Sequence, residues 1–148
     1  MTNDFISKAT EFSRDFELEY NECNVEFLQK TNDVFLKSEW EETNEAIADL
    51  SYRYAYGAME ETLDGFADQA FLALNGVYKT LRMLGYKHDA ATNLVGVVMN
   101  RVCDANLSKR NADGTITYKD GKVQKPSTFK APEYDDIIAL EGSFGGIC

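Results

Sequence analysis

The fold is decided by a stretch that reads MEETLDGFADQAFLALNGVYKTLRML over residues 59–84. Its apolar residues recur every three or four positions, which is the spacing that lines them up along one side of an α-helix. Gly85 follows at once and suits the position just beyond a helix C-terminus. The apolar positions are Leu63, Phe66, Ala67, Ala70, Phe71, Leu74, Val77, Tyr78 and Leu81. The stretch therefore predicts one long helix with a buried side.

Helical spacing continues on both sides of this stretch. We expect a short helix over residues 4–20 and a long one that starts near residue 31 or 33 and ends near residue 57. A further helix is expected from Asp89, as its possible N-cap, to about residue 105. Several helices of this kind are typical of an all-α helical bundle.

The pattern changes in the C-terminal third of the chain. Residues 115–125 combine strand-forming Thr, Ile, Tyr and Val with a central Asp-Gly pair, and so predict a short β-hairpin. From Pro126 onward we expect an extended chain, with a mobile tail over residues 141–148. The whole therefore reads as a single domain over residues 1–148, all-α with a short C-terminal β-hairpin or extended tail.

Composition excludes several classes of protein. The chain has 148 residues, of which 44% are hydrophobic, enough for the core of one domain. No apolar run approaches the roughly 18–20 residues of a membrane span, and the N-terminus lacks the pattern of a secretory signal. Three widely spaced cysteines fit a reducing compartment. We expect a cytoplasmic protein with no membrane partner.

Charge is unevenly distributed. The net charge is −10; residues 1–68 carry 17 acidic and 5 basic residues, whereas residues 101–130 carry 3 acidic and 7 basic ones. An acidic protein is poorly suited to bind a nucleic-acid polymer, because phosphate neutralisation needs a basic face. An acidic face that meets an anion usually does so through a metal ion. The alternative is an ordinary solvated acidic surface.

Carboxylates recur at helical spacing in two of the expected helices. Glu42 and Glu45 are three residues apart, and Asp64 and Asp68 are four apart, so each pair shares a helix face. Oxygen ligands of this kind suit Mg²⁺, with Mn²⁺ as a possible substitute. Zinc is disfavoured because His88 is the single histidine, and a di-iron centre because no Glu-x-x-His motif is present. The sequence predicts a magnesium site or, alternatively, a solvated helix surface.

Two motif blocks resemble a known family. Glu42-x-x-Glu45 followed by Asp68 resembles the MazG and phosphoribosyl-ATP pyrophosphohydrolase superfamily, whose pattern is Glu-x-x-Glu, a spacer, then Glu-x-x-Asp. The run Asn106-Leu-Ser-Lys109, an Asp-Gly pair, then Gly121-Lys-Val-Gln-Lys125-Pro126 is similar to a signature of phosphoribosyl-ATP pyrophosphohydrolase-like proteins, many of them from phages. One position departs from the pattern: Gly65 stands where the family has Glu, and Asp64 or, less well, Glu61 would replace that ligand.

The resemblance implies an all-α hydrolase that cleaves a nucleoside triphosphate between its α and β phosphates and releases pyrophosphate. It implies a metal-binding helical core over residues 31–105 and a phosphate-binding segment over residues 106–132. The implied metal ligands are Glu42, Glu45, Asp64 and Asp68. The implied catalytic residues are Glu41, which would orient or deprotonate water, and Glu42. The implied substrate-binding residues are Asn106, Lys109, Lys122 and Lys125 for the phosphates.

Aromatic residues on the expected helices have two interpretations. Phe12, Phe16 and Trp40 could stack on the nucleobase or fill the core. The resemblance also implies a homodimer or homotetramer whose C-terminal hairpin reaches a neighbouring site, located in the host cytoplasm if the chain is phage-encoded. Two alternatives stay open: a phosphoribosyl-ATP pyrophosphohydrolase of histidine synthesis, and an inactive helical interaction protein in which Gly65 marks a lost ligand.

Overall fold

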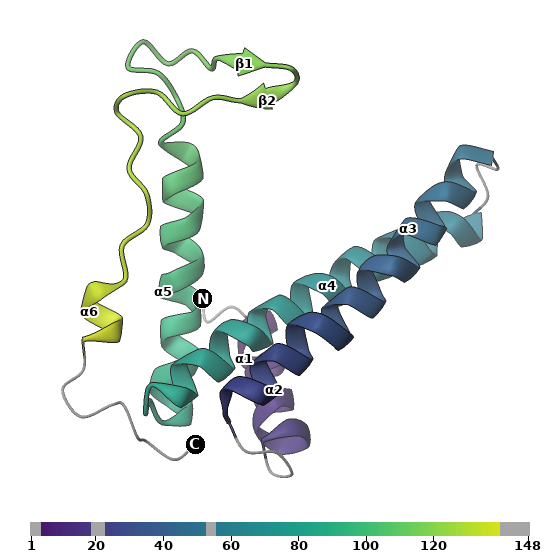
Figure 1. Ribbon diagram of the computed structural model, residues 1–148, viewed down its shortest axis with the longest axis vertical. Helices are drawn as coiled ribbons and strands as arrows, with labels where there is room; N and C mark the ends of the chain where they lie inside the picture. Colours follow the sequence, from purple (N-terminus) through teal and green to yellow (C-terminus); the bar gives the residue numbers. More distant parts are fainter. Residues whose placement is uncertain (1–3, 19–22, 53–55, 140–148) are drawn as a thin grey trace.

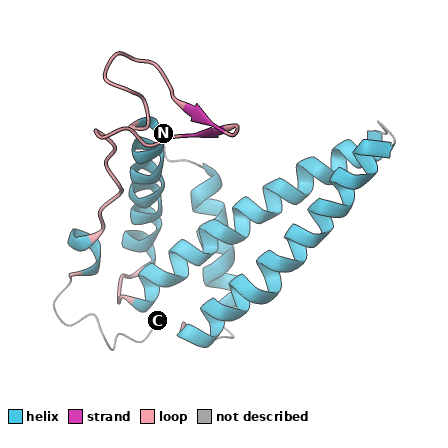
Figure 2. Ribbon diagram, turned by 45° about the horizontal axis from the view of Figure 1, so that its top comes forward, coloured by secondary structure: helices cyan, strands magenta, loops and turns pink. Residues whose placement is uncertain are grey.

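The computed structural model describes residues 4–18, 23–52 and 56–139, and there the chain is mostly helical with one two-stranded antiparallel sheet (Figure 2). This confirms a mostly helical fold with a short β-hairpin. The tail expected over residues 141–148 lies outside the described residues. No helix within the described ranges combines the length and the apolar character that crossing a bilayer requires.

The N-terminal third consists of short helical segments that lead into a long helix. The segments are α1 (Asp4–Phe12), a π-helical turn η1 (Ser13–Glu17), α2 (Val25–Lys30), a second π-helical segment η2 (Thr31–Leu36) and α3 (Lys37–Tyr52). The expected helix start near residue 31 or 33 was wrong, because the helical run already begins at Val25. Asn24 caps it there: its side-chain oxygen accepts a hydrogen bond from the Phe27 N–H at 2.9 Å.

Helices α3 and α4 (Tyr56–Met83) form an antiparallel hairpin (Figure 1). They approach closely where Gly65 faces Thr43, since a Cβ at residue 65 would collide with the Thr43 hydroxyl. That hydroxyl is fixed, because it donates to the Glu39 carbonyl at 2.6 Å and accepts from Gln69 Nε2 at 2.8 Å. Gly65 therefore has a packing role: it permits the close contact of the two helices.

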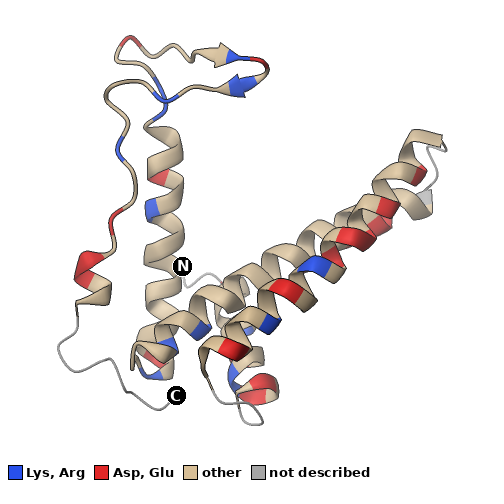
Figure 3. Ribbon diagram, viewed as in Figure 1, with Lys and Arg blue, Asp and Glu red and all other residues tan. Residues whose placement is uncertain are grey.

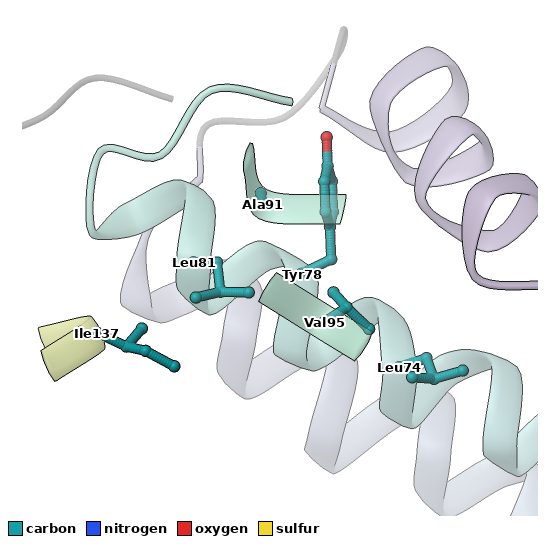
Figure 4. Close-up of a cluster of buried hydrophobic side chains, with 6 residues drawn as sticks. All are labelled: Leu74, Tyr78, Leu81, Ala91, Val95 and Ile137. Atoms are coloured by element: carbon teal, nitrogen blue, oxygen red, sulfur yellow. The ribbon is translucent and has the colours of Figure 1, made fainter. Parts of the chain in front are cut away.

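The hydrophobic core lies where α4 turns into α5 (His88–Leu107). As expected, Gly85 follows the helix, with a φ of 97° that favours glycine. The prediction of Asp89 as the N-cap was wrong. α5 begins at His88, and its N-cap is Lys87, whose side chain makes no capping hydrogen bond. Figure 4 shows the buried cluster, which consists of Leu74, Tyr78, Leu81, Ala91, Val95 and Ile137.

A buried lysine joins α4 to the N-terminal segments. Lys79 is 0% exposed, and its Nζ lies 2.5 Å from a Glu17 carboxylate oxygen. The same Nζ donates to Thr31 Oγ1 at 3.1 Å and lies 4.4 Å from the centre of the Phe27 ring. An ammonium group is tolerated inside a protein only with such partners. Burial lowers the pKa of Lys79, and the hydrogen bond that its ammonium donates to Glu17 opposes that shift.

The C-terminal part forms the expected hairpin from strands β1 (Tyr118–Lys119) and β2 (Lys122–Val123). Asp120 and Gly121 have φ values of 51° and 75°, as a two-residue type I′ turn requires. The strands are shorter than the 115–125 pattern suggested.

The segment after the hairpin returns along α5 to the core. It is extended as expected, except for one turn of helix, α6 (Asp135–Ile138), which the sequence analysis missed. Ile137 is buried in the core, and its carbonyl accepts a hydrogen bond from the Tyr86 hydroxyl at 2.8 Å. Arg101 of α5 donates two hydrogen bonds to Asp136, both 2.7 Å long. These contacts are tertiary and leave no periodic signal in so short an element.

Candidate carboxylate site between the two long helices

Seven carboxylates line one hollow between α3 and α4, which we term the carboxylate groove. Its volume is about 320 Å³, and Ala46 and Gly65 form part of its wall. The seven are Glu39, Glu42, Glu45, Asp49, Glu61, Asp64 and Asp68. Figure 3 shows acidic residues following one another along both helices.

Helical geometry explains why these residues converge. Thr43 and Gly65 lie at the contact line between the helices, and residues three or four positions apart share a helix face. Glu39, Glu42 and Asp49 follow one side of that line on α3, and the acids of α4 follow the same side. The groove is therefore a consequence of spacing in two antiparallel helices.

The groove carries negative charge without a positive partner among the described residues. No Lys or Arg lines it. The pKa of Glu39 is raised, first by partial burial and then by the nearby carboxylates of Asp68, Glu42 and Asp64. In the described residues no three acidic, histidine or cysteine side chains are already arranged closely enough to hold a metal ion. Cation binding would thus require these side chains to turn toward a common point.

The structure brings the four predicted metal ligands, Glu42, Glu45, Asp64 and Asp68, to this one groove. Glu41 does not line it: its side chain is exposed, with a carboxylate oxygen 3.9 Å from Lys37 Nζ on the preceding turn of α3. Its catalytic role stays a prediction.

The sequence analysis missed two groove residues, Glu39 and Asp49, and named Glu61 only as a weaker substitute for the ligand missing at Gly65. A spacing signal was present for each of the three. Glu39 precedes Glu42 by three residues, and Glu61-x-x-Asp64 has the Glu-x-x-Asp spacing of the family pattern. Asp49 follows Glu45 by one helical turn.

The predicted phosphate-binding residues lie elsewhere in the chain. Asn106 and Lys109, at the end of α5, contact each other, with Lys109 Nζ donating to Asn106 Oδ1 at 2.7 Å. Lys122 is exposed on β2, and Lys125 Nζ lies 4.7 Å from the centre of the Phe129 ring. We term residues 109–125 the basic arm. Figures 1 and 2 show it projecting from the end of α5, well away from α3 and α4.

The three predicted aromatic residues divide between two places. The rings of Phe12 and Phe16 stack at 5.0 Å, and Phe12 packs edge-on against Phe71 of α4 at 5.2 Å. Phe71 lies about one helical turn beyond Asp68 on α4, and none of these three rings lines the carboxylate groove. Trp40 is 57% exposed and lies on the opposite side of α3 from the groove.

Comparison of the chain with protein-family models, with curated proteins and with solved structures finds no match. A functional proposal therefore depends on the geometry of the groove, the basic arm and the motif resemblance.

Proposed function

We propose that this protein is a Mg²⁺-dependent nucleoside triphosphate pyrophosphohydrolase, which converts a nucleoside triphosphate into the monophosphate and pyrophosphate. The proposal rests on the carboxylate groove. Seven acidic side chains from two helices line this hollow of about 320 Å³, and no Lys or Arg lines it. In this groove the pKa of Glu39 is raised, first by partial burial and then by the neighbouring carboxylates, and such shifts are frequent at functional sites.

The donor set suits a hard divalent cation. Mg²⁺ prefers carboxylate oxygens and keeps part of its water shell for substrate phosphates. Glu42, Glu45, Asp64 and Asp68 would hold it, and Glu39 and Glu61 lie in the same groove. When bound, the cation supplies charge neutralisation on the phosphates and lowers the pKa of a coordinated water.

The chain's own residues then have separate roles. A groove carboxylate that does not hold the cation accepts a proton from the attacking water. Of the two predicted catalytic residues, Glu42 lines the groove and would act as a cation ligand, whereas Glu41 points outside it. The proton-accepting role then belongs to Glu39 or Glu61, which line the same groove. The half-exposed Phe12 and Phe16 rings offer a face on which a nucleobase can stack. The lysines of the basic arm neutralise phosphate oxygens.

A second copy of the chain completes the proposed site. The chain exposes 10455 Å², whereas a compact monomer of 16.7 kDa exposes about 7,600 Å². The side of the α3–α4 hairpin opposite the groove presents Trp40, Ile47 and Phe66, each at least 38% exposed. Burial of this face in a homodimer or homotetramer removes apolar surface from water.

The partner subunit is also the source of the basic arm. The core packs the end of α4 against the first turns of α5, and α5 then extends about 30 Å from the turn at Gly85 to the arm (Figure 1). In the described residues, the arm's exposed Lys119 and Lys122 make no ion pair. Their charge complements the groove of another copy.

The decisive experiment for the activity is a substrate panel. The protein with Mg²⁺ is incubated with each common ribo- and deoxyribonucleoside triphosphate and with phosphoribosyl-ATP, and the products are separated. We expect a monophosphate and pyrophosphate from at least one substrate. Release of single phosphates would contradict the proposed bond cleavage, and turnover of phosphoribosyl-ATP alone would favour the alternative in histidine synthesis. No turnover of any substrate would favour a helical interaction protein, which the exposed apolar face also fits.

Matched variants test the residue assignment. Glu42→Gln and Asp68→Asn remove groove charges without changing size, and we expect both to abolish turnover while the helical circular dichroism is kept. Glu26→Gln, an equal change at an exposed position of α2, is the control and should retain activity. Wild-type turnover by either groove variant would contradict the assignment.

Mixing tests the partner's contribution. Asp68→Asn and the double variant Lys122→Gln/Lys125→Gln are each expected to be inactive or strongly impaired. After mixing in equal amounts and subunit exchange, half of the dimers contain one subunit of each variant. One of the two sites in such a mixed dimer has intact acids and an intact arm. About one quarter of all sites, and so about one quarter of wild-type activity, should therefore return. No recovery, with an active wild type, would show that the arm does not act across subunits.

A further inference from the structure

The turn between α4 and α5 contains a polar cluster that the proposed activity does not use. Tyr78 is 0% exposed, and its hydroxyl accepts a hydrogen bond from Arg82 Nη1 at 2.8 Å. The same hydroxyl lies 2.8 Å from Nδ1 of His88, the chain's single histidine. The two rings meet edge to face at 5.8 Å.

The donors and acceptors in this cluster determine the tautomer of His88. A guanidinium group can only donate, so Tyr78 is the acceptor toward Arg82. The Tyr78 hydroxyl proton has His88 Nδ1 as its acceptor when that nitrogen presents a lone pair. The buried hydroxyl proton is thus paired if His88 is neutral, with its own proton on Nε2.

Protonation of His88 conflicts with this arrangement. A proton on Nδ1 would face the Tyr78 hydroxyl, which would then have to accept hydrogen bonds from both His88 and Arg82. The hydroxyl's own proton would at the same time lose its acceptor inside the protein. A buried donor left without an acceptor loses its water hydrogen bond with no replacement, which destabilises the closed arrangement. The protonated form therefore favours a conformation in which His88 leaves Tyr78.

The charged groups around His88 have mixed signs. From η1 come Arg14 and Asp15, which form an ion pair, and Arg82 comes from α4. Asp89 of α5 and Glu11 of α1 line the same hollow of about 450 Å³. Burial and the nearby Arg14 lower the pKa of His88, and Asp89 opposes that shift. The hollow gives the released imidazolium access to solvent.

We propose that the His88–Tyr78–Arg82 cluster is a pH-sensitive latch that holds α5 against α4 and opens when His88 takes up a proton. The closed latch fixes the direction of α5, and with it the position of the basic arm. Opening therefore loosens the arm relative to the rest of the chain. The latch is independent of the proposed hydrolase activity, since it uses no groove residue.

The sign of the pH dependence follows from linkage. The pKa of His88 is lowered in the closed state and returns to about 6.5 in the open state. The closed state is thus fully favoured above pH 6.5 and loses stability as the pH falls below that value toward the pKa of the closed state.

Two measurements test the latch. The first is the ¹⁵N spectrum of the His88 ring at pH 7.5, where we expect the proton on Nε2 alone. The second is amide hydrogen exchange at residues 84–92 between pH 7 and pH 5. Base-catalysed exchange slows as pH falls, so we expect the protection of these amides, corrected for that intrinsic change, to drop in this range. Residues 43–50 of α3 serve as the internal reference.

His88→Gln is the matched variant, because its side-chain oxygen can accept from Tyr78 but cannot titrate. We expect the loss of protection between pH 7 and pH 5 to disappear in this variant. Equal pH dependence in wild type and His88→Gln would overturn the proposal. A wild-type ring protonated at Nδ1 at pH 7.5 would also overturn it, and this result does not require the variant to fold.

Discussion

The two halves of α4 belong to one continuous helix and have different surroundings. In the C-terminal half, Leu74, Tyr78 and Leu81 are at most 7% exposed, whereas Leu63 and Phe66 in the N-terminal half are 70% and 57% exposed. The apolar spacing of the sequence is the same in both halves. Hydrophobic periodicity thus predicts the helix, but not which part of its face this chain covers by itself.

Charge differs between the halves in a similar way. Lys79 in the C-terminal half is buried and meets Glu17, Thr31 and Phe27. Asp64 and Asp68 in the N-terminal half lie in a groove without a basic residue. The charge of Lys79 in the C-terminal half is thus paired within the chain, while the N-terminal half leaves its acidic and apolar side chains at the surface.

The largest effect is expected from the buried ion pair of the C-terminal half. Lys79→Ala removes the cation that Glu17 faces, and loss of one partner of a buried pair costs about 3–5 kcal/mol. We expect urea unfolding to show a loss of free energy of unfolding in this range. The double variant Lys79→Met/Glu17→Gln should recover part of it. A loss below about 1 kcal/mol for Lys79→Ala would show that this contact does not support the fold.

A smaller effect is expected at the close helix contact in the N-terminal half. Gly65→Ala places a methyl group against the Thr43 hydroxyl, and such overpacking costs about 1–3 kcal/mol. Gly76→Ala in the same helix is the control, since nothing lies within 4 Å of its added Cβ and alanine favours a helix by up to about 1 kcal/mol. We expect opposite shifts in melting temperature. A stabilising Gly65→Ala would contradict the packing role of Gly65.

The crowded carboxylates give a pH-dependent effect. The pKa of Glu39 is raised in the folded state, so the folded protein binds this proton more tightly than the unfolded chain does. The protonated Glu39 side chain therefore contributes stability at low pH, and this contribution is lost as the pH rises above about 4.5. Glu39→Gln should therefore stabilise the metal-free protein at pH 7 and change it little at pH 4. Urea unfolding at both values measures this, with Glu41→Gln outside the groove as control. Destabilisation by Glu39→Gln at pH 7 would be inconsistent with repulsion in the groove.

The smallest effect on stability is expected at the exposed apolar face. Phe66→Ser should change the free energy of unfolding of the monomer by no more than about 0.5 kcal/mol. It should nevertheless reduce the mass measured by light scattering, because the dimer loses apolar contact. Leu107→Ser, at a 67% exposed position of α5, is the control. An unchanged mass for Phe66→Ser, or a monomeric wild type, would exclude this face as the subunit interface.

Much of the fold was predictable because long helices and an Asp-Gly turn have local signals. The spacing over residues 59–84, Gly85 and the hairpin around Gly121 were all confirmed. The start at Val25 was missed although Asn24 is a good cap, because the residues before it show no regular spacing. α6 was missed because it is one turn long and depends on the burial of Ile137.

The candidate site was predictable in part. Glu42, Glu45, Asp64 and Asp68 line one groove, as their spacing in the sequence suggested. Spacing of three or four residues keeps side chains on one helix face, and the two faces meet because the helices are antiparallel neighbours. The departure at Gly65 has a physical cause that the sequence alone did not reveal: a side chain there would collide with Thr43. The separation of the basic arm from the groove depends on the packing of α5 against α4, and such a tertiary arrangement has no local signature.

Binding of Mn²⁺ to the ¹⁵N-labelled protein shows whether the carboxylate groove holds a divalent cation, because a paramagnetic ion broadens the amide signals of nearby residues. At substoichiometric Mn²⁺ we expect broadening of the amides around Glu42, Asp64 and Asp68, its reversal by excess Mg²⁺, and its loss in Asp68→Asn. Broadening that is absent, or that is spread evenly over the exposed acids outside the carboxylate groove, would contradict the account.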